Sequence, residues 1–220
     1  MAIIFDGQTA TALGGGSGGQ PFQDLPDTPH VLVGILYDCH AFTNDVDEYP
    51  GWTIFYKFLN AIVPYYAPLM ADGSMGTPVR GTQYGGGSRH NFTASGLLMA
   101  PPGYVVTAIN VRWDGIQGAG TCVKAFQLAF ALWTAQGVSS GMTTLSPWQG
   151  GDGQIGSTGS SDYGPGDVNA VPNAPAISTT GSSAQFGAGP GGCMVGLAGR
   201  SGDLIDALGG IWAVPRIVSP

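Results

Sequence analysis

Two apolar segments in the middle of the chain predict a β-hairpin. Apolar and polar residues alternate from Val105 to Trp113, whereas residues 123–133 form a nearly continuous apolar run. Alternation with a period of two is the pattern of a half-buried strand, and a short unbroken apolar run is typical of a fully buried one. The turn-forming residues 114–120 between them allow the two strands to pair.

The other apolar segments are less regular. Residues 52–66 fit either a strand or one face of a helix, because their large side chains satisfy both periods, and Pro64 is expected to end the element. Residues 136–183 are mostly Gly, Ser, Thr, Asn and Pro. This composition predicts long surface loops with short strands at most.

Glycine-rich loops recur along the chain. The first runs from Gly14 to Gly19, the second begins at Gly85, and a looser third copy extends from Phe186 to Gly192; each is followed by an apolar segment. Recurrence of this kind indicates three similar β units arranged around a pseudo-threefold axis.

The composition agrees with an all-β fold. With 38 Gly and 16 Pro among 220 residues, tight turns are frequent, while the 43% share of hydrophobic residues is too high for a disordered chain. Many turns between short apolar runs are typical of sandwiches, barrels and prisms. We expect one domain covering residues 1–220 with little helix.

Charge and hydropathy exclude two classes of partner. The formal net charge is -7, so the basic surface that binds phosphates is missing and no nucleic-acid partner is expected. The longest apolar stretches, such as 125–133, are shorter than the roughly 20 residues of a membrane-spanning helix. Residues 1–6 lack the pattern of a secretory signal, which predicts a protein that is cytoplasmic or exported by another route.

The C-terminal part of the chain carries the most specific motif. Residues 195–210 read Val-Gly-Leu-Ala-Gly-Arg-Ser-Gly-Asp-Leu-Ile-Asp-Ala-Leu-Gly-Gly, and residues 15–19 read Gly-Gly-Ser-Gly-Gly. The pair resembles the jacalin-related lectins, which have a Gly-Gly-x-Gly-Gly loop near the N-terminus and a Gly-x-Ser-Gly-x-x-x-Asp hairpin near the C-terminus. Leu197 and Ala198 depart from the aromatic residues that the family more often has there.

The resemblance implies a β-prism I fold, in which three four-stranded Greek-key sheets surround a pseudo-threefold axis and both chain ends lie together. Because such lectins are usually about two-thirds as long as this chain, we expect insertions near residues 43–74 and 137–183.

The resemblance also implies a metal-independent sugar site without a cofactor. Its residues would be Gly19, Asp203 and Leu204 through their backbone N–H groups, Asp206 through its carboxylate, and the adjacent Gly18 and Gly202. Residues 203–206 are similar to the mannose-preferring members of the family. We expect glycans or glycoproteins as partners and a homo-oligomer, because several weak sites together give useful avidity.

The chemistry of these residue types suits a saccharide. Adjacent sugar hydroxyls both donate and accept, so a site needs converging donors and an acceptor. An ionised Asp206 can accept from two hydroxyls, and charge-assisted hydrogen bonds are roughly twice as strong as neutral ones. Glycine at position 19 lets the backbone approach a ligand closely. The one strong site is expected here, because neither of the first two loops is followed by a similar hairpin.

Other sequence features leave different functions open. An enzyme could use the Asp38-Cys39-His40 cluster, but adjacent strand residues point to opposite faces. The acidic residues 44–48 could serve a glycosidase or a weak calcium site, or form a solvated loop. Aromatic residues between 49 and 66 would suit a structural subunit of a larger assembly, or core packing. Cys39, Cys122 and Cys193 are expected to be free thiols, although one disulfide is possible.

Overall fold

The computed structural model describes residues 2–10, 13–45, 53–87, 92–116, 120–134, 136–139, 143–151, 153–158 and 181–218, with the backbone alone at positions 2, 40–45, 53–56, 116, 153–158 and 217. These residues form three antiparallel sheets and no helix. The all-β prediction is therefore confirmed for the part of the chain that the structure describes. No helix that could cross a bilayer occurs in that part.

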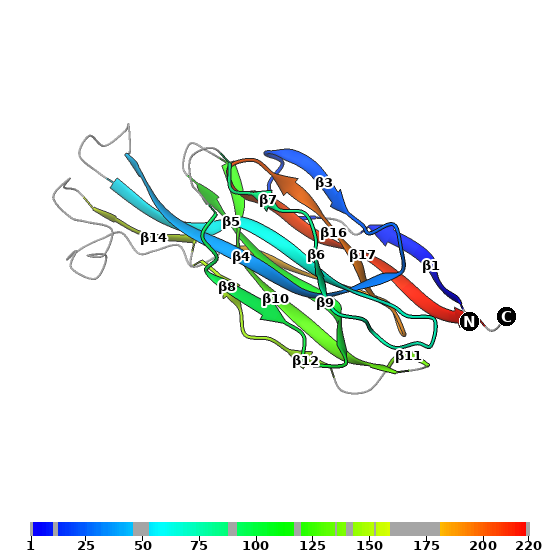
Figure 1. Cartoon of the computed structure of the whole chain (residues 1–220). Helices are drawn as coiled ribbons and strands as arrows, with labels where there is room; N and C mark the ends of the chain where they lie inside the picture. Colours follow the sequence, from blue (N-terminus) through cyan, green and yellow to red (C-terminus); the bar gives the residue numbers. More distant parts are fainter. Residues whose placement is uncertain are drawn as a thin grey trace.

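The first sheet joins the two ends of the chain. Its spatial order is β1 (Ala2–Ala10), β17 (Ile205–Val218), β16 (Cys193–Ser201) and β3 (Gln20–Asp24), and the short β2 (Gly14–Gly15) also pairs with β17. Ala2 lies opposite Val218, so the termini are neighbours (Figure 1). This pairing places the first glycine loop beside the C-terminal hairpin.

The second sheet is built on the long hairpin of β4 (His30–Asp45) and β5 (Thr53–Pro68), with β8 (Gly96–Met99) beside β4 and β14 (Gly153–Thr158), β6 (Val79–Arg80) and β7 (Tyr84–Gly85) beside β5. Residues 53–66 of the ambiguous segment 52–66 thus lie in a strand. Phe58, Leu59 and Ile62 are fully buried, so this part of the range 43–74, expected as an insertion, belongs to the core.

Pro64 lies inside β5, and the prediction that it ends the element was wrong. It stands opposite Ile35 of β4, while on its other side β6 and β7 leave a gap. A proline cannot donate to a strand ladder, so it is tolerated where the neighbouring strand is interrupted. Within this gap the Pro64 carbonyl accepts a hydrogen bond from the Gly81 N–H at 2.8 Å.

The third sheet contains the hairpin that the apolar pattern predicts. It consists of β9 (Tyr104–Ile116) and β10 (Gly120–Thr134), flanked by β15 (Ser182–Gly187) on β9 and by β11 (Gly137–Val138), β12 (Thr144–Leu145) and β13 (Gln149–Gly150) on β10. The pairs run from Gly120 with Ile116 to Leu132 with Tyr104, which confirms the hairpin. Of the predicted insertion 137–183, residues 159–180 lie outside the described residues.

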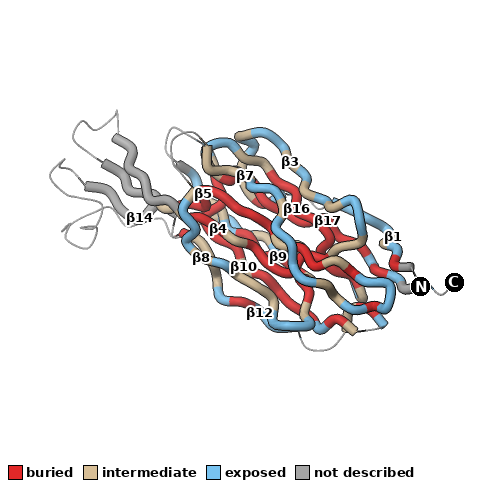
Figure 2. Tube along the Cα trace, viewed as in Figure 1, coloured by how far each residue is buried: buried red, intermediate tan, exposed pale blue. Residues whose placement is uncertain are grey.

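Side chains from all three sheets meet in one central core. Ile35 and Ile62 come from the second sheet, Phe126 and Leu128 from the third, and Leu208 from the first; all five are fully buried. Buried residues follow the middle of the long strands, and the edge strands are exposed (Figure 2). A core shared in this way fixes the three hairpins relative to one another.

The three hairpins repeat one local irregularity near the same end of the fold. Each has a β-bulge whose extra residue has no partner across the hairpin: Asp206 in β17, Asn60 in β5 and Lys124 in β10. A bulge aims its extra side chain away from the regular pleat and is common beside functional sites. The repetition makes these three residues equivalent under the pseudo-threefold symmetry.

A glycine pair docks on each bulge. Gly15, Gly85 and Gly150 all have positive φ, and each pairs with the alanine that follows the bulge. The next glycine donates its N–H to the carbonyl of the bulge residue: Gly16 to Asp206 at 2.8 Å, Gly86 to Asn60 at 3.0 Å and Gly151 to Lys124 at 2.6 Å. Only glycine fits at positions 15, 85 and 150 without strain, because an added Cβ there would meet the carbonyl oxygen of the bulge residue.

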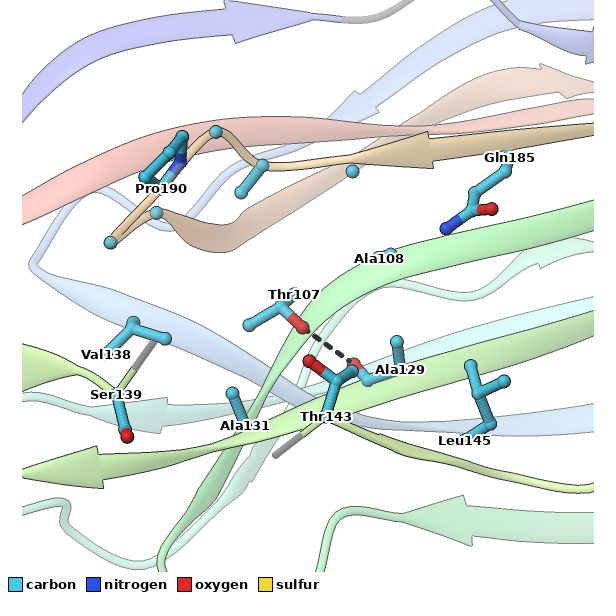
Figure 3. A pocket seen from close by; sticks show the side chains of 15 residues that line it. Thr107, Ala108, Ala129, Ala131, Val138, Ser139, Thr143, Leu145, Gln185 and Pro190 are labelled. Atoms are coloured by element: carbon cyan, nitrogen blue, oxygen red, sulfur yellow. Dashed lines mark hydrogen bonds between the residues drawn. The ribbon is translucent and has the colours of Figure 1, made fainter. Parts of the chain in front are cut away.

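The third repeat of the glycine loop was therefore assigned wrongly from the sequence. The structural equivalent of the first two pairs is Gly150–Gly151, not the segment 186–192. Residues 188–192 instead connect β15 to β16, and together with Thr107 and Ala129 they line a hollow of about 680 Å³ (Figure 3). The equivalent pair escaped notice because it contains two consecutive glycines instead of three.

Replacing Gly150 by alanine tests this symmetry. Its φ is 129°, and an added Cβ would overlap the Lys124 carbonyl and lie 2.7 Å from the Ala125 Cα. We expect the free energy of unfolding to fall by about 1–3 kcal/mol, measured by urea denaturation. Gly189→Ala is the control, because nothing lies within 4 Å of its added Cβ, and it should change stability by less than about 0.5 kcal/mol. Equal stability of the two variants would contradict the docking role.

Candidate functional site

Of the three repeats, the one formed by the two ends of the chain places a glycine loop against the carboxylate of its bulge residue, Asp206. An added Cβ at Gly18 would collide with the Asp206 Oδ1, and one at Gly19 would lie 2.5 Å from the Oδ2. Gly202 borders the same group, since its Cβ would stand 3.8 Å from the Oδ2 and 3.7 Å from the Gly19 Cα. Residues at least 183 positions apart thus share one small site.

The hairpin turn supplies the other predicted residues. Gly202 and Asp203 are exposed, and Leu204 is half-buried. The Gly202 N–H donates to the Leu204 carbonyl at 3.0 Å, which folds residues 202–204 into a tight turn beside Asp206. The structure therefore brings together Gly18, Gly19, Gly202 and Asp206, with the backbone of Asp203 and Leu204 next to them.

The conformation of the loop depends on glycine. Gly19 has a φ of 60°, in the left-handed region that side chains rarely adopt, and its added Cβ would also press on the Ser201 carbonyl group. The absence of both side chains lets the loop backbone lie directly on the carboxylate. A ligand that bonds to Asp206 would consequently meet main-chain groups at the same time.

Asp206 is half-buried at this surface, and its environment acts on its charge in two directions. Burial raises the pKa of its carboxyl above the ordinary Asp range, while the hydrogen bond from Cys122, the charge of Arg200 and the Gly202 amide lower it. The group faces solvent on one side and reaches no lysine or arginine within ion-pair distance among the described residues. It is free to accept hydrogen bonds from a ligand.

Two supporting residues were missed in the sequence. Cys122 of β10 is a buried free thiol, and its Sγ lies 3.8 Å from the Asp206 Oδ1. Burial raises the pKa of Cys122 to about 12, so the thiol keeps its proton and can donate it weakly to the carboxylate. Arg200 of β16 contacts the glycine loop itself. The motif leaves position 200 open, and nothing in the sequence connects residue 122 to this site.

The second glycine loop forms the border of the site. An added Cβ at Gly87 would collide with the Asp203 carboxylate, so the backbone of this loop lies against the hairpin turn. The ring of Tyr84 also stacks on that of Phe22, with centroids 3.9 Å apart. These contacts hold the first and second repeats together at the end where Asp206 lies.

At the two other repeats the equivalent side chain forms contacts inside the protein. Asn60 is fully buried and donates to the Asp38 Oδ2 at 2.8 Å, and Asp38 also accepts from Ser95. Lys124 is buried and reaches the Asp114 Oδ2 at 3.4 Å. Of the three bulge residues, Asp206 alone presents a carboxylate at the surface.

Other sequence hypotheses find less support in the geometry. The hydrogen bonds of Asp38 tie β4 to β5 and to residues 93–95, which is a structural use of this acid. The side chain of His40 and residues 46–52 of the acidic and aromatic segment lie outside the described residues. Cys39, Cys122 and Cys193 form no disulfide with one another, as expected. No cluster of three or more His, Cys, Asp or Glu side chains suited to a metal occurs among the described residues.

Known proteins resemble this chain in structure. No family model and no curated protein sequence matches it. Artocarpin, solved as a mannopentose complex, is 14% identical and superposes with a TM-score of 0.51 over 93% of this chain and 97% of its own. A Malaysian banana lectin is 15% identical, with a TM-score of 0.51 over 96% and 100% of the two chains.

A third similar structure is the mannose-specific jacalin-related lectin from Morus nigra in complex with mannose. It is 15% identical, with a TM-score of 0.50 and 94% coverage of each chain. At these identities the likeness establishes architecture alone. The resemblance first indicated by residues 15–19 and 195–210 is therefore confirmed for the fold: this chain has the β-prism I fold of the jacalin-related lectins.

Proposed function

We propose that this protein is a non-catalytic, metal-independent lectin that binds mannose-type or glucose-type glycans. The Asp206 carboxylate accepts hydrogen bonds from two adjacent sugar hydroxyls, and the N–H groups of Gly19, Asp203 and Leu204 donate to sugar oxygens. The observation that carries this proposal is the close approach of Gly18 and Gly19 to Asp206 at an exposed end of the fold.

The chemistry of the site favours a neutral sugar. A carboxylate that accepts from two hydroxyls is matched by backbone donors at its rim, which suits groups that donate and accept at once. Glycines around the acid leave room for a ring to approach the main chain. Arg200 opposes the charge of Asp206, which makes the site less suited to a cationic ligand.

Mannose is preferred over galactose in this proposal. The support comes from residues 203–206, which are similar to the mannose-preferring lectins, and from two structural neighbours solved in complex with mannopentose and mannose. Because the equivalent positions at Asn60 and Lys124 are occupied by internal contacts, each chain offers one such site. Self-association into a homo-oligomer is part of the proposal, since it would convert single weak sites into avid binding.

Calorimetric titration with methyl α-mannoside and methyl α-galactoside tests the function. Methyl mannoside has about 13 non-hydrogen atoms, and at about −0.3 kcal/mol each its Kd should be on the order of 1 mM. We expect saturable mannoside binding and at least about tenfold weaker galactoside binding. Tighter binding of galactoside would contradict the preference. Absence of saturable binding to either sugar would contradict the lectin function and favour a structural or interaction subunit.

A further inference from the structure

Arg200 donates two hydrogen bonds to the first glycine loop. Its Nε donates to the Gly18 carbonyl at 2.7 Å, and its Nη2 donates to the Gly19 carbonyl at 2.8 Å. A planar guanidinium that holds two successive carbonyl oxygens fixes the orientation of both peptide groups. Among the described residues, this side chain donates to main-chain oxygens and forms no ion pair with a carboxylate.

These two hydrogen bonds determine the orientation of the Gly19 N–H, which is a donor of the proposed sugar site. The Gly18 carbonyl and the Gly19 N–H belong to one planar trans peptide group, so they point in opposite directions. Because Arg200 draws the oxygen toward β16, the N–H is turned away from β16. We propose that Arg200 is the positioning residue that aims the Gly19 N–H at the sugar, an inference that rests on the proposed function.

Glycine makes such a restraint necessary. A peptide group between two glycines can rotate to the opposite orientation with little steric resistance, since neither neighbour carries a Cβ. A loop composed of Gly18 and Gly19 would therefore lose its aimed donor for part of the time. Two charge-assisted hydrogen bonds from a half-buried arginine oppose this rotation before the sugar arrives.

The same side chain acts on the acceptor of the site. Its charge lowers the pKa of Asp206 against the larger effect of burial, which raises it. The other titratable groups near the carboxylate are the Cys122 thiol from β10 and the Asp203 carboxylate of the adjacent turn, and the loop backbone meets Asp206 at Gly18 and Gly19. Loss of Arg200 should thus raise the pKa of Asp206 further, so that sugar binding fails at a higher pH on the acid side.

The test compares Arg200→Met and Arg200→Lys, with Arg80→Met as a charge-matched control on the exposed strand β6. Methyl α-mannoside is titrated by calorimetry from pH 4 to 8, and the Gly19 amide is followed by ¹⁵N NMR without sugar. We expect Arg200→Met to weaken binding at neutral pH by about tenfold, the effect of one hydrogen bond, and to shift the acid loss of binding to higher pH.

Arg200→Lys keeps the charge but cannot make the forked contact, so it should retain the acid profile and regain only part of the affinity. In the free protein, the Gly19 amide resonance should move or broaden in Arg200→Met and stay unchanged in Arg80→Met.

Wild-type affinity and pH profile in Arg200→Met would overturn the positioning role and leave the lectin function standing. If the unaltered protein binds no sugar, the proposed function fails, and an unchanged Gly19 resonance would then overturn the positioning role separately. Should Arg200→Met not fold, Arg200→Lys with unchanged affinity and an unchanged Gly19 resonance would also overturn it.

Discussion

Asp206→Asn is expected to abolish detectable mannoside binding while leaving the protein folded. The amide keeps the size of the side chain but replaces one accepting oxygen by a donor and removes the charge. Two hydrogen bonds to a charged group contribute about 1.5–3 kcal/mol each, so the Kd should rise by at least ~100-fold. Calorimetry and binding to a glycan array measure the loss.

The stability of Asp206→Asn separates lost binding from lost folding. Burial raises the pKa of Asp206 in the folded state above its unfolded value, so the ionised acid disfavours the folded state at every pH above that raised pKa. This unfavourable contribution fades as the pH falls through the folded pKa, and a neutral amide removes it. We therefore expect an unchanged or higher Tm at neutral pH together with the loss of binding.

Asp6→Asn is the matched control. The carboxylate of Asp6, on β1, forms an exposed ion pair with Arg216 of β17 at 2.5 Å. Asp6 stands opposite Val214, near the end of β17 that is remote from Asp206. An exposed ion pair contributes little to stability, so this variant should bind and unfold as the original protein does. Comparable binding losses in the Asp6 and Asp206 variants would contradict the location of the site.

The sequence contained enough information to predict the fold class and the two segments of the site. The alternation in residues 105–113 and the apolar run in 123–133 follow directly from one buried face and one buried strand, so their pairing could be predicted. The glycine loop at 15–19 and the acid at 206 could be connected because the resemblance implied adjacent chain ends.

Other features depend on contacts that no local pattern reports. Pro64 reads as a strand end, and it lies within β5 because the neighbouring strand is interrupted beside it. Gly150 is a turn residue by composition, and its equivalence to Gly15 is visible only once both are seen on a bulge. The contact between Cys122 and Asp206 joins residues 84 positions apart in different sheets.

The pseudo-threefold symmetry explains why one repeat is suited to bind a ligand and two are not. Each repeat places a glycine pair on the backbone of a bulge residue, and the repeats differ in what the side chain of that residue contacts. At Asn60 and Lys124 that side chain is buried and bonded to Asp38 and Asp114, which connects the strands of its own hairpin. The first repeat leaves Asp206 at the surface, where its carboxylate receives a weak hydrogen bond from the Cys122 thiol.

Gly18→Ala should block the site by sterics without changing any charge. The new methyl group would occupy the space of the Asp206 Oδ1, so the carboxylate must rotate away from the loop or the loop must move off β17. Either change separates the acceptor from the Gly19 donor, and a misplacement of about 1 Å is enough to cost on the order of 100-fold in a positioned site. Calorimetric titration with methyl α-mannoside measures this loss.

The backbone at Gly18 does not require glycine, because its φ is outside the positive range, so Gly18→Ala should remain folded with a stability change of less than about 1–2 kcal/mol. Ser17→Ala, on the exposed neighbouring residue, is the control and should bind normally. The pair isolates the role of close approach: both variants keep the acid and Arg200, and they differ only in whether a methyl group stands between the loop and the carboxylate. Unimpaired mannoside binding by Gly18→Ala would show that the sugar does not use the contact between this loop and Asp206.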